Sequence, residues 1–192
     1  MGTMMILPNQ KVNSGMMENL NLSSRPSIDL YLTPAVCDFF CQAAAVCLDN
    51  QGHAPGVILT VTGDLTAQFQ LFWEPVTQRM RDSFNDLQYA TEAGAYCLSI
   101  LIIQKLTAYQ VIRQSQKGTG FDFWLGDKQD QYPFTNTARL EVSGILTGNK
   151  PLIQQRATQK IAQTKPSDNL NLPAYVAVVE FSAPLLQWVL KQ

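Results

Sequence analysis

Two short runs of alternating residues, 120–125 and 138–146, constrain this chain more than any other feature. The alternation predicts two β-strands, and the polar stretch between them predicts that the strands pair antiparallel. Side chains alternate between the two faces of a strand, so Asp122 lies opposite the apolar residues of the first run and Glu141 opposite those of the second. If the apolar faces coincide, Asp122 and Glu141 project together from neighbouring strands.

This pair of acids has two interpretations. Neighbouring carboxylates repel each other unless a divalent cation or a proton lies between them. Alternatively, both acids lie on a solvated face of the sheet, as charged side chains mostly do. The sequence leaves both interpretations open.

Composition indicates one folded domain without a global nucleic-acid-binding charge. The 192 residues are 46% hydrophobic, which is enough for a full core, and only 15% are charged. Because the formal net charge is -1, any contact with nucleic acid would have to be local. Residues 1–25 mix Met, Asn, Gly and Ser and are expected to be irregular, with a single α/β domain over residues 26–192.

Histidine and cysteine usage excludes several kinds of site. His53 is the single histidine and falls in a turn sequence, which disfavours Ser-His-Asp and Cys-His hydrolases. The four cysteines form no CxxC pair, so we expect buried free thiols and no structural zinc. The N-terminus lacks a signal-peptide pattern and no apolar run approaches the length of a membrane span, so a cytoplasmic protein without a membrane partner is expected.

The remaining periodicities predict a mixture of helices and strands. Thr33-Pro34 is typical of a helix start, and the helix is expected to reach about Asn50. Its Phe39, Phe40 and Cys47 should face the core. The other expected elements are a hairpin at 57–73, a helix at 86–107, a strand at 109–115, a helix at 150–164, a strand at 175–181 and a short C-terminal helix from Ser182.

From residue 86 onwards, the expected order is one helix, three strands, one helix and one strand. This αβββαβ series, over residues 86–182, resembles the core of the restriction-endonuclease-like superfamily, the PD-(D/E)xK phosphodiesterases. The resemblance implies an α/β fold with this core, to which an N-terminal helix and a β-hairpin are added. It also implies that Asp122 is the strand aspartate, Glu141 the first residue of the (D/E)xK tripeptide and Glu92 the helix glutamate. Asp122 and Glu141 would hold Mg²⁺, with a backbone carbonyl near Val142.

The tripeptide departs from the family pattern because Ser143 stands where the family has lysine. That lysine helps to activate the attacking water and stabilises charge on the phosphate, which a neutral hydroxyl cannot do. Four cations on nearby elements could replace it: Lys117, Arg139, Arg156 and Lys160.

Three classes of function remain open. The first is a metal-dependent nuclease with Asp122, Glu141, Ser143 and Glu92 at its site. The second is a catalytically inactive relative that acts as a binding or scaffold module. The third is an unrelated α+β protein that binds a ligand or forms homo-oligomers, with its apolar helix at 90–106 as part of an interface. In the first two classes, nucleic acid would bind to a local basic patch drawn from Arg79, Arg81, Arg113, Lys150, Arg156, Lys160 and Lys165.

Overall fold

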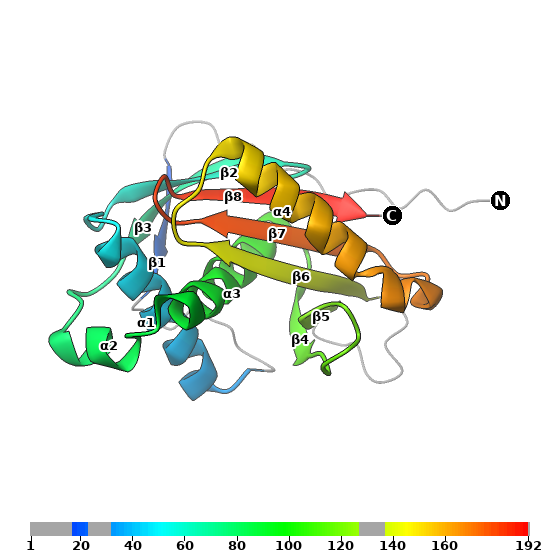
Figure 1. Cartoon of the computed structure of the whole chain (residues 1–192), viewed down its shortest axis with the longest axis horizontal. Helices are drawn as coiled ribbons and strands as arrows, with labels where there is room; N and C mark the ends of the chain where they lie inside the picture. Colours follow the sequence, from blue (N-terminus) through cyan, green and yellow to red (C-terminus); the bar gives the residue numbers. More distant parts are fainter. Residues whose placement is uncertain (1–16, 23–31, 127–136, 192) are drawn as a thin grey trace.

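The computed structural model describes residues 17–22, 32–126 and 137–191. Within them, eight strands form one mixed sheet, in the order β1-β3-β2-β8-β7-β6-β5-β4 (Figure 1). The strands are β1 (Glu18–Asn21), β2 (Val57–Gly63), β3 (Ala67–Phe72), β4 (Gln110–Gln114), β5 (Phe123–Gly126), β6 (Ala138–Ile145), β7 (Ala174–Glu180) and β8 (Leu185–Lys191). The helices are α1 (Pro34–Asn50), α2 (Gln78–Ser83), α3 (Leu87–Leu106), α4 (Lys150–Gln163) and the 3-10 helix η1 (Lys165–Leu170).

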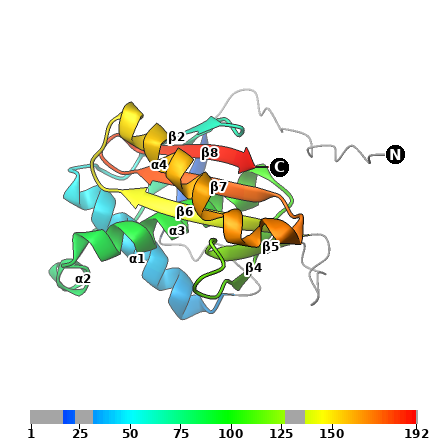
Figure 2. The same ribbon diagram turned by 45° about the vertical axis from the view of Figure 1, so that its right-hand side comes forward.

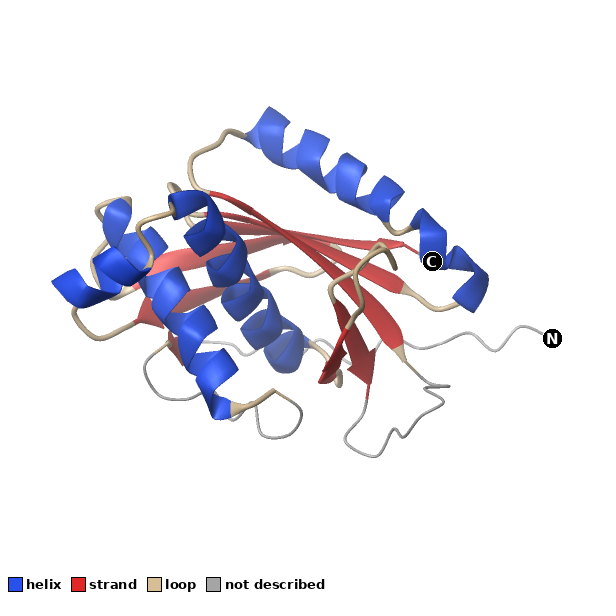
Figure 3. Ribbon diagram, turned by 60° about the horizontal axis from the view of Figure 1, so that its bottom comes forward, coloured by secondary structure: helices blue, strands red, loops and turns tan. Residues whose placement is uncertain are grey.

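Helices cover both faces of the sheet (Figure 3). On one face, α3 packs against β6 and β7, and α1 lies alongside α3. On the other face, α4 runs over β6, β7 and β8 (Figure 2). This double cover explains why every residue of β7 is buried.

The half of the chain that begins with α3 forms a continuous part of the sheet. Strands β4, β5 and β6 are joined antiparallel, and β7 lies parallel to β6 after the crossover through α4. Strand β8 then pairs antiparallel with β7 and parallel with β2, which joins the β2–β3 hairpin to the same sheet. The predicted α/β class and the mixed sheet flanked by helices are therefore confirmed.

Local sequence signals account for the positions of the helices. Helix α1 begins at Pro34 directly after Thr33, as predicted, and its Phe40 and Cys47 are buried. The Asp86 carboxylate accepts hydrogen bonds from the first backbone N–H groups of α3. Asn149 caps α4 in the same way through Leu152 N–H.

Three features differ from the sequence-based expectations. The C-terminal helix expected from Ser182 is wrong, because residues 185–191 form β8; Leu186 and Trp188 alternate into the core of the sheet. Helix α2 was not expected. Strand β1 lies within the segment expected to be irregular, of which residues 1–16 and 23–25 fall outside the described residues, as does the polar loop 127–136.

The apolar helix considered as an oligomer interface is covered within the chain. Twelve residues of α3 are buried, most of them between α1 and the sheet. Its apolar surface is therefore used for the protein's own core. Among the described residues, none of the helices combines the length and apolar character that a membrane crossing requires.

Candidate functional site

Asp122 lies directly before β5, where the pairing of β5 with β6 ends. β5 pairs with β6 only through residues 138–140, so β5 does not cover the edge of β6 beyond Leu140. The Asp122 carboxylate occupies the start of this edge, and its Oδ2 accepts a hydrogen bond from Val142 N–H at 2.8 Å. In a strand, the N–H and C=O of one residue point to the same side, so the Val142 carbonyl lies on this edge as well.

Helix α3 passes close to the same edge. A Cβ atom at Gly144 would lie 2.3 Å from the backbone oxygen of Thr91, so only glycine allows this approach of α3 to β6. One and a half turns after Thr91, the Tyr96 hydroxyl donates a hydrogen bond to Asp122 Oδ1 at 3.1 Å. The Tyr96 ring packs against Phe40 and Phe123, which fixes its position.

Glu141 is buried within β6, and its side chain faces α4. Only 1% of the residue is exposed, so the interpretation of a solvated acid is wrong for Glu141. Its Oε1 accepts a hydrogen bond from Lys160 Nζ at 2.6 Å, whereas Oε2 has no hydrogen-bond donor among the described residues. Burial, and then the charge of Asp122, raise the pKa of Glu141 to about 7.

The two carboxylates act on each other. Burial also raises the pKa of Asp122, although the bond from Val142 N–H and the Lys160 charge work in the opposite direction. The ionised forms of both acids are therefore disfavoured together, as expected for two carboxylates in one poorly solvated place. Near neutral pH, a shared proton or a further cation would relieve the repulsion that the Lys160 charge leaves between the two acids.

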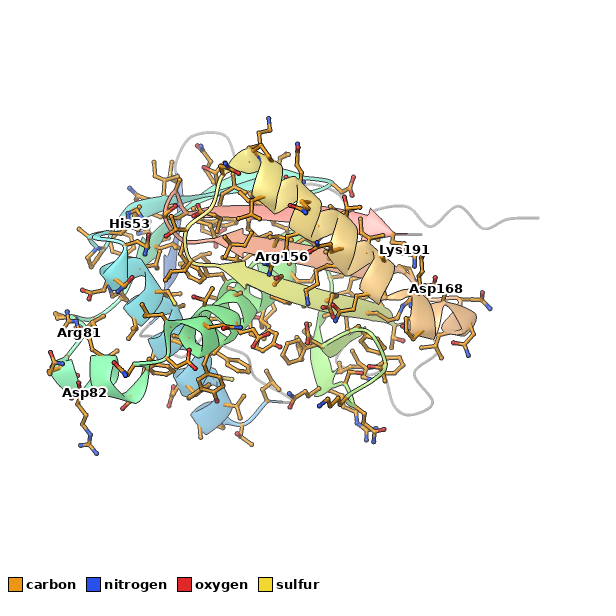
Figure 4. The ribbon with its side chains drawn as sticks, viewed as in Figure 1. His53, Arg81, Asp82, Arg156, Asp168 and Lys191 are labelled. Carbon is orange, nitrogen blue, oxygen red and sulfur yellow. The ribbon has the colours of Figure 1, made fainter. Side chains whose placement is uncertain are left out.

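Ser143 lies two residues beyond Glu141 on the same face of β6. Its hydroxyl accepts a hydrogen bond from Arg156 Nη1 at 2.9 Å. Arg156 is one turn before Lys160 on α4, so the two cations face the two β6 side chains in order. Figure 4 shows Arg156 between α4 and the sheet.

The other two candidate cations do not reach the carboxylates. Arg139 is tied to the segment around η1 by hydrogen bonds to Ser167, Asp168 and Leu172, so it serves the structure there. Lys117 is exposed in the loop before β5. Lys160 is thus the cation that the fold places on Glu141.

Glu92 lies one turn before Tyr96 on α3, and its side chain is exposed. The charges of Glu92, Asp122 and Glu141 all affect the pKa of the Tyr96 phenol. Burial raises the pKa of the Tyr96 phenol most, followed by the effects of Asp122, Glu92 and Glu141. Of the four sequence-predicted site residues, the structure therefore brings Asp122 and Glu141 together. Ser143 lies beyond Glu141 on the face of β6 that α4 covers. Among the described residues, the exposed Glu92 makes no hydrogen bond or ion pair with the other three and is linked to them only by its effect on the pKa of Tyr96.

Tyr96 is the site residue that sequence analysis missed. Its position four residues after Glu92 put it on the same helix face, which is the one signal that could have identified it. Lys160 was one candidate among four, and only the tertiary structure distinguishes it from the others.

The oxygen atoms at this edge suit a hard divalent cation. No described residue donates a hydrogen bond to the buried Glu141 Oε2, and the Asp122 carboxylate is close enough to raise the pKa of Glu141. The Val142 carbonyl lies on the edge of β6 next to Asp122. Among the described residues, no three or more His, Cys, Asp or Glu side chains are grouped to hold a metal ion. A cation would therefore be held by these two acids, backbone oxygen and water.

The expected basic patch does not form as a whole. Arg81 pairs with Asp49 at the end of the molecule opposite Asp168 and Lys191 (Figure 4). Arg113 and Trp124 line a surface hollow of about 420 Å³ against β4 and β5. Of the seven cations considered for the patch, Lys160 and Arg156 are the two that contact side chains of β6 in the described structure.

Comparisons with known proteins do not add to this description. The chain matches no protein-family model, no curated protein and no solved structure. The function must therefore be inferred from the residues and geometry of the site.

Proposed function

We propose that this protein is a divalent-metal-dependent phosphodiesterase of the restriction-endonuclease-like kind. Asp122 and Glu141 would be its metal-binding acids, and Lys160 would take the place of the missing tripeptide lysine. The observation that carries the proposal is the buried pair of carboxylates, in which Lys160 Nζ donates to Glu141 Oε1 and none of the described residues donates to Oε2.

The order of the elements supports the same proposal. The series α3-β4-β5-β6-α4-β7 contains an antiparallel three-stranded meander followed by a parallel crossover strand. Asp122 lies directly before the second strand of the meander, and Glu141 lies within the third. The resemblance implied a position on a strand for both acids, which Glu141 has and Asp122 adjoins.

The chain's own residues would prepare the site for the reaction. When bound, Mg²⁺ polarises the phosphate and lowers the pKa of the attacking water. Tyr96 and the Val142 N–H hold the Asp122 carboxylate in one orientation. Lys160 favours the ionised form of Glu141 and provides positive charge where charge builds up on the phosphate. Glu92, which is exposed on α3, would orient a water of the outer shell.

Metal binding can be tested by thermal unfolding. Mg²⁺ or Mn²⁺ should stabilise the wild type by about 2.7 kcal/mol at a hundredfold excess over Kd. The Glu141→Gln and Asp122→Asn variants should lose this stabilisation, whereas Asp82→Asn, which changes an exposed acid on α2, should keep it. A wild type that does not respond to either metal at millimolar concentration would favour the second class of function, an inactive binding module.

Catalysis can be tested by moving the cation. Lys160→Met should abolish Mg²⁺-dependent cleavage of single- and double-stranded DNA or RNA. Ser143→Lys in the Lys160→Met background should restore part of the activity, because it returns a lysine to the tripeptide beside Glu141. Full activity of Lys160→Met would refute the role assigned to Lys160.

A further inference from the structure

Arg156 is a half-buried cation that has no acidic partner among the described residues. Its Nη1 donates to the neutral Ser143 hydroxyl at 2.9 Å. Among the described residues, Arg156 takes part in no ion pair, and this is the single hydrogen bond that its side chain makes. A guanidinium has five N–H donors, so most of its hydrogen-bonding capacity remains for a ligand.

Arg139, on the neighbouring part of β6, is an arginine with a structural role and serves as a comparison for Arg156. Its side chain is 3% exposed, pairs with Asp168 and donates to the backbone oxygens of Thr164 and Leu172. Within the part of the chain that the structure describes, Arg156 has neither an acid partner nor a backbone acceptor. The hydrogen bond to Ser143 joins α4 to β6 but uses one of the five guanidinium N–H donors, so packing alone does not account for an arginine at position 156.

The place of Arg156 relative to the acids indicates its ligand. Arg156 and Lys160 are about 6 Å apart along α4, and Ser143 and Glu141 about 7 Å apart along β6. Arg156 thus lies about 6–7 Å from the carboxylates along α4 and β6. This separation is comparable with the distance between successive phosphates of a nucleic-acid strand. A planar guanidinium fork can bind two oxygens of one phosphate.

We propose that Arg156 binds the phosphate that adjoins the one held at Asp122 and Glu141. This inference rests on the proposed phosphodiesterase function. It defines a phosphate subsite on α4 and implies a substrate with at least two successive phosphates, so that an isolated diester would not use Arg156.

Anion binding can be measured without metal. Inorganic phosphate, compared with chloride at equal ionic strength, should raise the melting temperature of the wild type and of Arg79→Gln, a matched change on α2. Arg156→Gln should lose at least half of this rise, and Arg156→Lys should keep an intermediate share. Unchanged melting temperatures in chloride and unchanged circular dichroism would establish that the variants fold.

Kinetics test the position of the subsite. For an oligonucleotide, Arg156→Gln should raise KM about 10- to 100-fold, as expected for lost hydrogen bonds to a charged group, and should change kcat little. Its cleavage of bis(p-nitrophenyl) phosphate should equal that of the wild type.

Equal phosphate stabilisation of wild type and Arg156→Gln would overturn the subsite. Equal losses with both substrates would overturn its placement beside the scissile phosphate. Phosphate stabilisation that depends on Arg156, together with no Mg²⁺-dependent cleavage by the wild type, would instead overturn the phosphodiesterase function and retain the anion site.

Discussion

Replacing Glu141 by Gln should stabilise the protein, although it removes a proposed metal-binding acid. The pKa of Glu141 is raised from 4.5 to about 7, mainly because the side chain is buried. At about 1.4 kcal/mol for each pKa unit, keeping this acid ionised in the folded state costs roughly 3 kcal/mol. A Gln amide has almost the same shape, can accept from Lys160 and carries no charge.

The sign of the effect follows from proton binding. Between about pH 4.5 and pH 7, folded Glu141 binds more protons than unfolded Glu141, so the free energy of unfolding of the wild type falls as pH rises. Above this window, the full cost is present. The gain of Glu141→Gln should therefore be about 2–3 kcal/mol at pH 8 and should vanish towards pH 4.

Urea denaturation in EDTA at several pH values measures this gain. Asp82→Asn serves as the control and should change the free energy of unfolding by less than about 0.5 kcal/mol. A Glu141→Gln variant that is less stable than the wild type at pH 8, or equally stabilised at all pH values, would refute the assigned burial and repulsion.

Three further predictions concern residues that support the site through packing and hydrogen bonding. Asp122→Ala should cost about 1–3 kcal/mol in urea denaturation, because it removes the acceptor for Val142 N–H; Asp122→Asn should cost less, and equal losses would contradict this account. Phe40→Ala should lower the free energy of unfolding by about 3–5 kcal/mol, since Phe40 is 9% exposed, and a loss below about 1 kcal/mol would show that it is not core. Gly144→Ala should lower the free energy of unfolding by about 1–3 kcal/mol or more, because the added Cβ forces α3 away from β6. Thermal unfolding would detect this loss, and an unchanged melting temperature would rule out the close approach.

Most of the sheet could be predicted from the sequence because its strands carry a clear period-2 pattern. The β2–β3 hairpin, β4, β6 and β7 lie close to their expected ranges. The start of β5 is later than expected, at Phe123 instead of residue 120. Gly120 has φ +82, and a Cβ there would lie 2.2 Å from the Gln163 backbone oxygen, so this residue belongs to a tight loop against α4.

What could not be predicted depends on contacts between distant segments. Alternation identified the face of β6 that carries Glu141. The burial of Glu141 comes from the packing of α4 on that face, and no local pattern in the sequence predicts this contact. The Lys160 contact likewise requires that α4 crosses β6 at one particular angle. The sequence of residues 182–184 is typical of a helix start. Residues 185–191 instead form the strand between β7 and β2, and no local signal indicates that pairing.

The position of β8 has a consequence for biosynthesis. Strand β8 is the last described strand of the chain, yet it lies in the interior of the sheet between β2 and β7. Until the ribosome has released residues 185–191, β2 and β7 each present an unpaired edge, and such edges readily pair with other chains. The complete sheet can therefore form only after β8 has been translated. A nonsense mutation just before Leu185 would leave β2 and β7 with unpaired edges that are prone to aggregation.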